Sequence, residues 1–448
     1  MNVNDKMREM PMKRLLVSMS LPIMLSMLIQ ACYNIVDSMF VARYSEAALA
    51  AVSLSFPVQT LMIAVSVGTA AGVNALLSRR LGEKKAEQAS QTALHGLFLA
   101  LCSWIVFAAG GLFLADIFAR AFTPSPDIAG QAAVYIRICT IFSFGVFVQI
   151  VMERIMQATG QAVYNMIMQG TGALINIVLD PILIFGWFGC PQLGIAGAAI
   201  ATVTGQILAM VLGWVLIQRR LSFLQLDVRR FRFSSVICRD IYAVGFPAII
   251  MSSISSIMTL GMNWILMPFS ELTISVFSIY SKLQQFVFMP VMGMNSALIA
   301  IIGYNYGAAL KERIVQAVRY SLIAAIGLMG LGMAVFLVFP QALLQLFSAS
   351  EQMLQLGIPA LRTISLSFVF AGISIVLCSV FQAMNEGMLS LWVSLGRQLV
   401  LVLPLAVLLG RTGGLDSLWW AFVIAEGLCM ILAIRGYHRL KTTKISAL

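Results

Sequence analysis

The chain has 448 residues, of which 60% are hydrophobic and only 10% are charged, and its mean hydropathy is +0.93. Soluble domains carry about 25% charged residues, so this composition excludes a soluble domain and indicates an integral membrane protein of many helices. The net charge of +11 does not indicate nucleic-acid binding, because the basic residues lie in short loops between apolar runs, where they set the topology.

Twelve apolar runs are long enough to cross a bilayer, so we predict an all-α integral membrane protein with twelve transmembrane helices. The predicted spans are 15–38, 47–77, 90–115, 131–156, 162–187, 193–217, 240–266, 274–304, 315–338, 357–381, 388–410 and 416–436. The first run follows basic residues, as in a signal peptide. It is too long for one and contains polar residues, so we interpret it as a retained first span.

The longest polar stretch divides the spans into two sets of six. We therefore predict a cytoplasmic N-terminal tail (1–14), an N-lobe (15–217), a cytoplasmic linker (218–239), a C-lobe (240–436) and a cytoplasmic C-terminal tail (437–448). The halves resemble each other weakly at an offset near 225 residues, at which Gly68 and Gly82 correspond to Gly293 and Gly307. Two repeats of six spans share one orientation, which is typical of a two-lobed transporter.

The distribution of Lys and Arg predicts the orientation of the chain. The two tails, Arg154 and the even-numbered loops hold 22 of the 29 basic residues, whereas the alternate loops hold only Arg43, Arg120 and Arg411. Basic residues stay on the cytoplasmic side of a membrane. We therefore expect both termini to be cytoplasmic and the protein to lie in the cell (inner) membrane.

Four polar or helix-breaking residues interrupt the first span. Pro22 weakens the helical hydrogen-bond ladder. Further along the span, Gln30 and Asn34 carry amides and Asp37 carries a carboxylate. Insertion of a carboxylate at the bilayer centre costs about 2.5 to 3.5 kcal/mol, so a carboxylate in a span usually has a functional role. The alternative is that Pro22 is a static kink and Asp37 ends the helix near the outer surface.

The fifth span carries a second carboxylate. Asn176 and Asp180 are four residues apart and share one helix face, and Pro181 follows them directly. Amide and carboxylate oxygens suit Na⁺, and the same carboxylate can take a proton. Thr202 in the sixth span offers a hydroxyl. A buried polar cluster that serves only helix packing is the alternative.

Several other residues have two interpretations each. Either Lys282 and Gln284 lie on a polar face that lines a cavity, or the Lys282 side chain extends to the outer membrane interface. Glu426 is a site in the C-half or a packing residue, and we expect Glu153 and Arg154 to form an interfacial salt bridge. Flexible methionines suit a pocket for varied ligands but more often fill gaps in the core. The candidates are Met258, Met289 and Met292.

The sequence lacks the motifs of an energy-coupled enzyme. It contains neither GxxxxGK[ST], which would bind ATP, nor HExxH, so the energy must come from an ion gradient or from the substrate's own gradient. We therefore expect no cofactor other than a coupling ion. A membrane potential of 100 mV supplies about 2.3 kcal/mol per charge moved.

These residues resemble those of a known family. Three parts of the sequence are similar to the multidrug and toxic compound extrusion (MATE) family, most closely to its DinF-like and MepA-like bacterial branches. They are Leu21-Pro22 with the segment from Tyr33 to Asp37, the end of the fourth span at Gln157, and the segment from Asn176 to Pro181. The likeness runs over all twelve spans.

The resemblance implies a fold and a function. The fold would be two six-helix lobes in a V around a central cavity, and the activity would be export of organic cations and amphipathic drugs in exchange for H⁺ or Na⁺. Asp37, Asn176 and Asp180 would bind the cation, with Thr202 close by, and Pro22 would be the bend point. Gln30, Tyr33 and Asn34 would face the cavity. We expect a monomer whose partners are small molecules and the lipid bilayer.

The sequence departs from the family pattern in its C-half. The stretches from Ile241 to Met267 in the seventh span and from Gly357 to Phe381 in the tenth carry no acidic residue, so the resemblance does not extend to a C-lobe Na⁺ site. Two rival functions stay open. A flippase for lipid-linked precursors needs a basic central cavity, for which Lys282 is the one candidate, and a channel or membrane-embedded interaction protein would use the acidic residues for packing.

Overall fold

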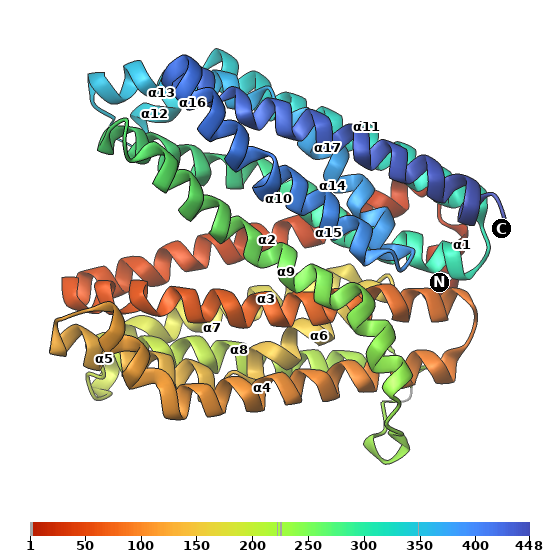
Figure 1. Ribbon diagram of the computed structural model, residues 1–448. Coiled ribbons are helices and arrows are strands. Elements are labelled where there is room, and N and C mark those ends of the chain that lie inside the picture. Colours follow the sequence, from red (N-terminus) through yellow and green to blue (C-terminus); the bar gives the residue numbers. More distant parts are fainter. Residues whose placement is uncertain (1–2, 222, 225, 348) are drawn as a thin grey trace.

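The computed structural model describes residues 3–221, 223–224, 226–347 and 349–448, and their side chains except those of residues 3–5 and 228. Helices make up nearly all of these residues (Figure 1). The α-helices are α1 (Val3–Glu9), α2 (Met12–Tyr44), α3 (Glu46–Gly82), α4 (Ala86–Phe122), α5 (Pro126–Ile141), α6 (Phe144–Ala158), α7 (Ala162–Phe185), α8 (Ile195–Arg220), α9 (Ser235–Leu266), α10 (Glu271–Gly307), α11 (Lys311–Val338), α12 (Pro340–Gln345), α13 (Glu351–Ser365), α14 (Phe368–Ala383), α15 (Gly387–Leu395), α16 (Val402–Leu418) and α17 (Trp420–Leu440). Short turns of other helix types are η1 (Trp187–Gly189), η2 (Val228–Arg230), η3 (Gly396–Val400) and η4 (Lys441–Ile445).

The described part of the chain has ten to twelve candidate spans, and it reaches the predicted twelve when two bent helix pairs each count as one span. Among the described residues, ten helical segments are long and apolar enough to cross a membrane, and two pairs, α5 with α6 and α13 with α14, qualify together. Each pair is bent, by 47° and 44°. Ser143 and Ser367 lie at the breaks, where their hydroxyl groups donate to the carbonyls of Thr140 and Ile364 at 2.7 Å. Such bonds satisfy carbonyls that the interrupted helix leaves free.

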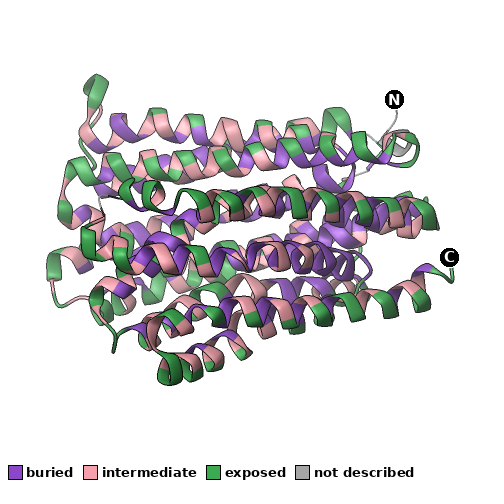
Figure 2. Ribbon diagram, turned by 90° about the horizontal axis from the view of Figure 1, so that it is seen from above, coloured by how far each residue is buried: buried purple, intermediate pink, exposed green. Residues whose placement is uncertain are grey.

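The helices form two lobes, as predicted. Figure 1 shows α2 to α8 in one layer and α10 to α17 in the other, while α9 crosses obliquely from the first layer to the second. Exposed and half-buried residues follow one another along the helices that Figure 2 shows from above. The exposed residues of α4 include large apolar side chains such as Val106 and Phe113, which are 70% and 73% exposed. Such side chains are expected on a face in contact with lipid. Of the ten unbroken spans among the described residues, α10 is the most buried, with 61% of its apolar window inside the molecule.

Glycines bring the lobes together at the end of the molecule where both termini lie, which we call the terminal end (Figure 1). Gly82 ends α3 so close to α10 that an added Cβ would lie 2.0 Å from the carbonyl oxygen of Tyr304. Gly307 meets the carbonyl oxygen of Arg79 at the same distance. The two glycines that correspond in the sequence repeat therefore form a reciprocal contact between the lobes, which no larger residue fits.

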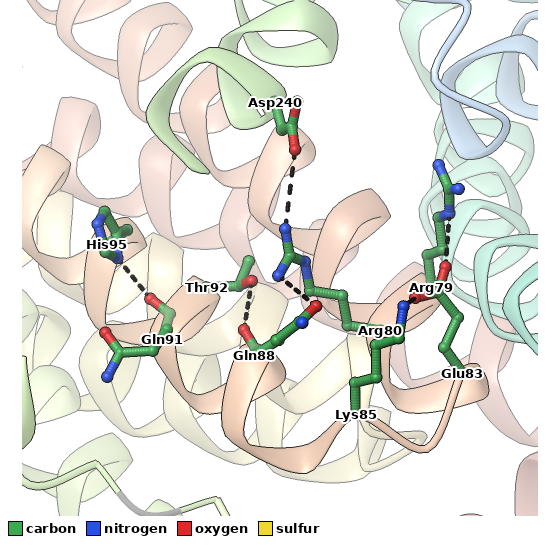
Figure 3. Close-up of polar contacts among 9 residues, drawn as sticks. All are labelled: Arg79, Arg80, Glu83, Lys85, Gln88, Gln91, Thr92, His95 and Asp240. Atoms are coloured by element: carbon green, nitrogen blue, oxygen red, sulfur yellow. Dashed lines mark hydrogen bonds and ion pairs between the residues drawn. The ribbon is translucent and has the colours of Figure 1, made fainter. Parts of the chain in front are cut away.

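Charged residues reinforce the terminal end (Figure 3). Arg80 of α3 reaches Asp240 of α9 across the lobes at 3.7 Å. Glu83 accepts from Lys85 at 2.8 Å and from Arg79 at 3.0 Å. Burial raises the pKa of Glu83, but the bonds from Lys85 and Arg79 outweigh it and hold that pKa below its ordinary value.

The N-terminal segment, residues 6–10, also bridges the lobes. On one side Lys6 donates to the carbonyl of Gly160, in the turn between α6 and α7, at 2.8 Å. On the other side Arg313 of α11 donates to the carbonyls of Met7 and Met10, both at 3.0 Å. The Met7 side chain is fully buried, and burial lowers the pKa of the Lys6 ammonium. The segment is thus held by both lobes at once.

The linker between the lobes packs on α4 through His95. Figure 3 shows the contact of its Nδ1 with the Gln91 carbonyl, and these atoms are 2.7 Å apart. Its Nε2 accepts from the backbone N–H of Ser234 at 2.9 Å. Because Nε2 accepts, the imidazole is neutral with its proton on Nδ1. The rings of Phe231 and Phe233 lie against it. His95 therefore anchors the linker.

Candidate functional site

Close packing of α7 against α8 builds the core of the candidate site. Gly205 of α8 faces the carbonyl oxygen of Gly172 so closely that a Cβ would lie 2.7 Å from it, and Gly197 meets the carbonyl oxygen of Leu183 at 2.4 Å. Glycine at these positions lets the two backbones approach each other. The approach places Thr202, on α8 between the two glycines, beside Asn176 of α7.

The amide of Asn176 joins the two helices. Its nitrogen lies 3.3 Å from Oδ1 of Asp180, one turn further along α7, and 3.3 Å from the hydroxyl of Thr202. When the amide is turned over, its nitrogen donates to Oδ2 of Asp180 at 3.2 Å and its oxygen accepts from the Thr202 N–H at 3.2 Å, which satisfies both atoms. Asn176 and Asp180 are 2% and 0% exposed. Asn176 therefore holds Asp180 in one orientation.

Asp37 of α2 completes an acidic pair with Asp180. The two carboxyl groups contact each other through a side-chain hydrogen bond, and Oδ1 of Asp37 has no other partner. Two carboxylates in contact repel each other unless a proton or a metal cation lies between them. We find no group of three or more His, Cys, Asp or Glu side chains able to hold a metal ion among the described residues. The pair with Asn176 and Thr202 thus offers oxygen ligands suited to H⁺ or Na⁺.

Tyr33, already a candidate from the sequence, and Cys139 interact electrostatically with the acidic pair. Cys139 and two further residues, Tyr135 and Gln59, escape the sequence analysis, and Tyr135 hydrogen-bonds with both of the others. These residues come from α2, α3 and α5, three helices whose contact no spacing within the chain reveals. Tyr135 is 2% exposed. They carry no charge, so a search for charged residues within apolar runs passes over them.

A cavity of about 310 Å³ lies inside the N-lobe beside these residues. Gln30 and Tyr33, candidates for the cavity, and Asn176 and Thr202, candidates for the cation site, line it. Its wall also includes Glu153 and Arg154, for which an interfacial salt bridge was the sequence-based expectation. That expectation is wrong for the residues described here: Glu153 accepts from Gln149 at 2.9 Å, Arg154 donates to Gln157 at 2.7 Å, and no ion pair joins them.

The remaining candidates lie outside this cavity. Asn34, three residues from Asp37, is exposed, and so is Lys282, while Gln284 and Met289 are half-buried. Met258 and Met292 pack against the apolar core.

Glu426 lies in the C-lobe, where it faces Arg397 at 3.6 Å, and both residues are 9% exposed. The pair joins η3 to α17 inside the C-lobe. It gives Glu426 a packing contact, one of the two interpretations that its sequence position allows.

Pro22 lies inside α2, which continues through it as one helix of 33 residues. Pro22 is buried, and two residues later the backbone of Met24 packs against Gly293 of α10, where an added Cβ would lie 3.0 Å from the Met24 nitrogen. The helix-weakening residue of α2 thus lies at a close contact between the lobes, on the same helix as Asp37.

A family model described as MatE matches residues 22–182 and 247–408, which together make up most of the chain and include the acidic pair. Two relatives are similar over nearly their whole length. The multidrug export protein MepA of Staphylococcus haemolyticus is 25% identical over 93% of this chain and 91% of its own. The FAD transporter of Shewanella oneidensis is 28% identical over 98% of both chains.

The fold is also similar to that of solved transporters. Structures titled MATE in the straight conformation and MATE in the bent conformation each superimpose with a TM-score of 0.91 at 26% identity. The match covers 100% of this chain in both cases, and 100% and 98% of those chains.

Proposed function

Because the chain belongs to the MatE family of transporters, we propose that it is a cation-coupled antiporter that exports organic cations and amphipathic drugs by alternating access. The observation that carries this proposal is the contact between Asp37 and Asp180 beside an internal cavity. Such a pair attracts either a coupling ion or a cationic drug, and occupancy by one weakens the attraction for the other. The coupling ion is H⁺ or Na⁺, and no further cofactor takes part.

The proposed switch combines the acidic pair with α2. A proton or Na⁺ at Asp37 and Asp180 neutralises them, Asn176 and Thr202 hold the ion or the protonated carboxyl group, and the drug loses its counter-charge. α2 then bends at Pro22, where the ladder lacks one N–H donor. The existence of straight and bent structures of a similar MATE supports a helix-bending mechanism.

The proposed orientation places the terminal end in the cytoplasm. The basic residues of the tails and of the linker gather there, and positive charge stays on the cytoplasmic side. In this orientation the contact between Gly82 and Gly307 closes the cytoplasmic side. The protein works as a monomer in the cell (inner) membrane.

Purified protein in liposomes loaded with ethidium tests this function. We expect ethidium efflux under an imposed pH gradient or Na⁺ gradient, and loss of that efflux in Asp180→Asn, because the amide can neither bind a proton nor supply the charge for Na⁺. The variant keeps the shape of the side chain, so its membrane expression should equal that of the wild type. Wild-type efflux in Asp180→Asn would refute the assignment.

A second candidate substrate is an anionic dinucleotide. The FAD transporter of Shewanella oneidensis supports it, as does Arg154, the one basic side chain among the residues that line the described cavity. The same liposomes loaded with FAD separate the two candidates. Efflux of FAD that competes with ethidium and is lost in Arg154→Gln would favour the dinucleotide.

A further inference from the structure

The cavity begins beside the acidic pair, at Asn176 and Thr202, and extends away from it to Glu153 and Gln157. On α7 the polar residues Asn165, Gln169, Asn176 and Asp180 follow one another on one side of the helix, and the first three line the cavity. From Asn165 to Asp180 is fifteen residues, or roughly 22 Å along the axis. Since α7 begins at Ala162 near the terminal end, this polar face runs from that end to the acidic pair.

A second polar face, on α6, lies opposite the beginning of this one. Gln149, Glu153 and Gln157 recur every four residues and line the same cavity. Gln149 connects the two faces, because its nitrogen donates to Glu153 at 2.9 Å and to the Gln169 oxygen of α7 at 3.1 Å. The carboxylate of Glu153 is therefore held among amide groups from both helices.

Two of these amides present buried oxygens that have no partner. They are Oε1 of Gln149 and Oδ1 of Asn165, whose side chains are 5% and 3% exposed. A buried acceptor without a partner costs about 1 to 3 kcal/mol. Beside a carboxylate, such oxygens are the ligands that a hard cation takes.

The Glu153 carboxylate has one charged neighbour in the cavity wall, Arg154, with which it interacts electrostatically. The Arg154 guanidinium donates its hydrogen bond to Gln157 at 2.7 Å, not to Glu153. On α4, which packs against α6, His95 is engaged by Gln91 and Ser234. In the part of the chain that the structure describes, no ion pair includes Glu153.

We propose that Glu153, Gln149, Asn165 and Gln169 form a second, inner binding site for a monovalent cation, through which the coupling ion passes between the acidic pair and the terminal end. This inference rests on the proposed function, since it assigns the path of the same ion. The ion would meet Glu153 in the cavity wall and the acidic pair beside the cavity, with amide oxygens between.

Two transport reactions in ethidium-loaded liposomes test the inner site. The first is efflux driven by a pH gradient and, separately, by a Na⁺ gradient, which identifies the ion. The second is ethidium exchange with equal pH and Na⁺ on both sides, which requires drug binding and alternating access but no net ion movement. The variants are Glu153→Gln, Glu153→Asp, and Glu87→Gln as a control that removes an exposed carboxylate at the start of α4.

In Glu153→Gln we expect gradient-driven efflux to fall by about tenfold or more, while exchange stays within about twofold of the wild type. Glu153→Asp should keep most of the driven efflux because the carboxylate remains, and Glu87→Gln should change neither reaction. Driven efflux within twofold of the wild type in Glu153→Gln would overturn the inner site. Equal loss of both reactions in Glu153→Gln and Glu153→Asp would overturn it too, since a structural role has that effect.

Failure of the proposed function gives a different result. If the proposed function is wrong, the wild type itself shows no efflux under either gradient, and the inner site is refuted together with the function. Wild-type efflux that is lost in Asp180→Asn but unchanged in Glu153→Gln removes the inner site alone.

Discussion

Replacing Gly82 with alanine should shift the transporter away from the conformation described here. The added Cβ would lie 2.0 Å from the Tyr304 carbonyl oxygen, whereas non-bonded heavy atoms prefer about 3.5 Å. The obstacle is backbone rather than a flexible side chain, so α3 and α10 must separate by roughly 1.5 Å at this point. Because these helices belong to different lobes, their separation opens the terminal end.

The size of the effect follows from the cost of overpacking. Inserting a methyl group into a close contact costs about 1 to 3 kcal/mol, which changes a two-state ratio by about 5- to 150-fold. Alanine also stabilises a helix by about 0.5 to 1 kcal/mol relative to glycine. That gain is common to both conformations and leaves their ratio unchanged. The net shift is towards the state that is open at the terminal end.

Hydrogen–deuterium exchange in nanodiscs measures this shift. Exchange of residues 79–85 and 303–310 should become faster in Gly82→Ala and remain unchanged in Gly330→Ala, whose Cβ would meet no atom within 4 Å. Gly307→Ala should act alike, and the double variant should add little because both residues belong to one contact. Unchanged exchange of both segments in folded Gly82→Ala would refute the reasoning.

Two further variants test contacts elsewhere. Arg313→Gln should speed amide exchange of residues 6–15, because the guanidinium holds two carbonyls of the N-terminal segment, whereas Lys311→Gln, which removes an exposed charge nearby, should not; equal exchange in both would show that Arg313 does not hold the segment. In the C-lobe, Arg397→Met leaves the Glu426 carboxylate buried without its partner and should lower the free energy of unfolding by about 3 to 5 kcal/mol. Thermal unfolding should show that adding Glu426→Gln recovers part of this loss, and a double variant less stable than Arg397→Met would contradict the pairing.

The sequence predicts the spans and the pairing of Asn176 with Asp180 well, because both depend on local patterns. Long apolar runs identify membrane helices whatever their neighbours are. Likewise, the four-residue spacing of Asn176 and Asp180 places them on one helix face, and the structure joins their side chains by a hydrogen bond. The correspondence of Gly82 with Gly307 also follows from the sequence, although not their reciprocal contact across the lobes.

Contacts between helices are what the sequence does not predict. Glu153 and Arg154 close an apolar run, which favours an interfacial ion pair, and only the packing of α6 against α7 turns them towards a cavity. Glu426 is 29 residues from Arg397, so their pairing depends on how α17 packs in the C-lobe. The bends at Ser143 and Ser367 lie within continuous apolar runs, and no proline marks them.

The most direct test of antiport is whether the drug can drive the ion. Liposomes containing the protein would receive an ethidium gradient with equal pH and equal Na⁺ on both sides, and a pH dye or ²²Na⁺ would report ion movement. We predict that ethidium moving down its gradient drives H⁺ or Na⁺ the opposite way, and that Asp180→Asn abolishes this movement. Ethidium flux without ion movement, or ion flux that continues without ethidium as through a channel, would contradict the account.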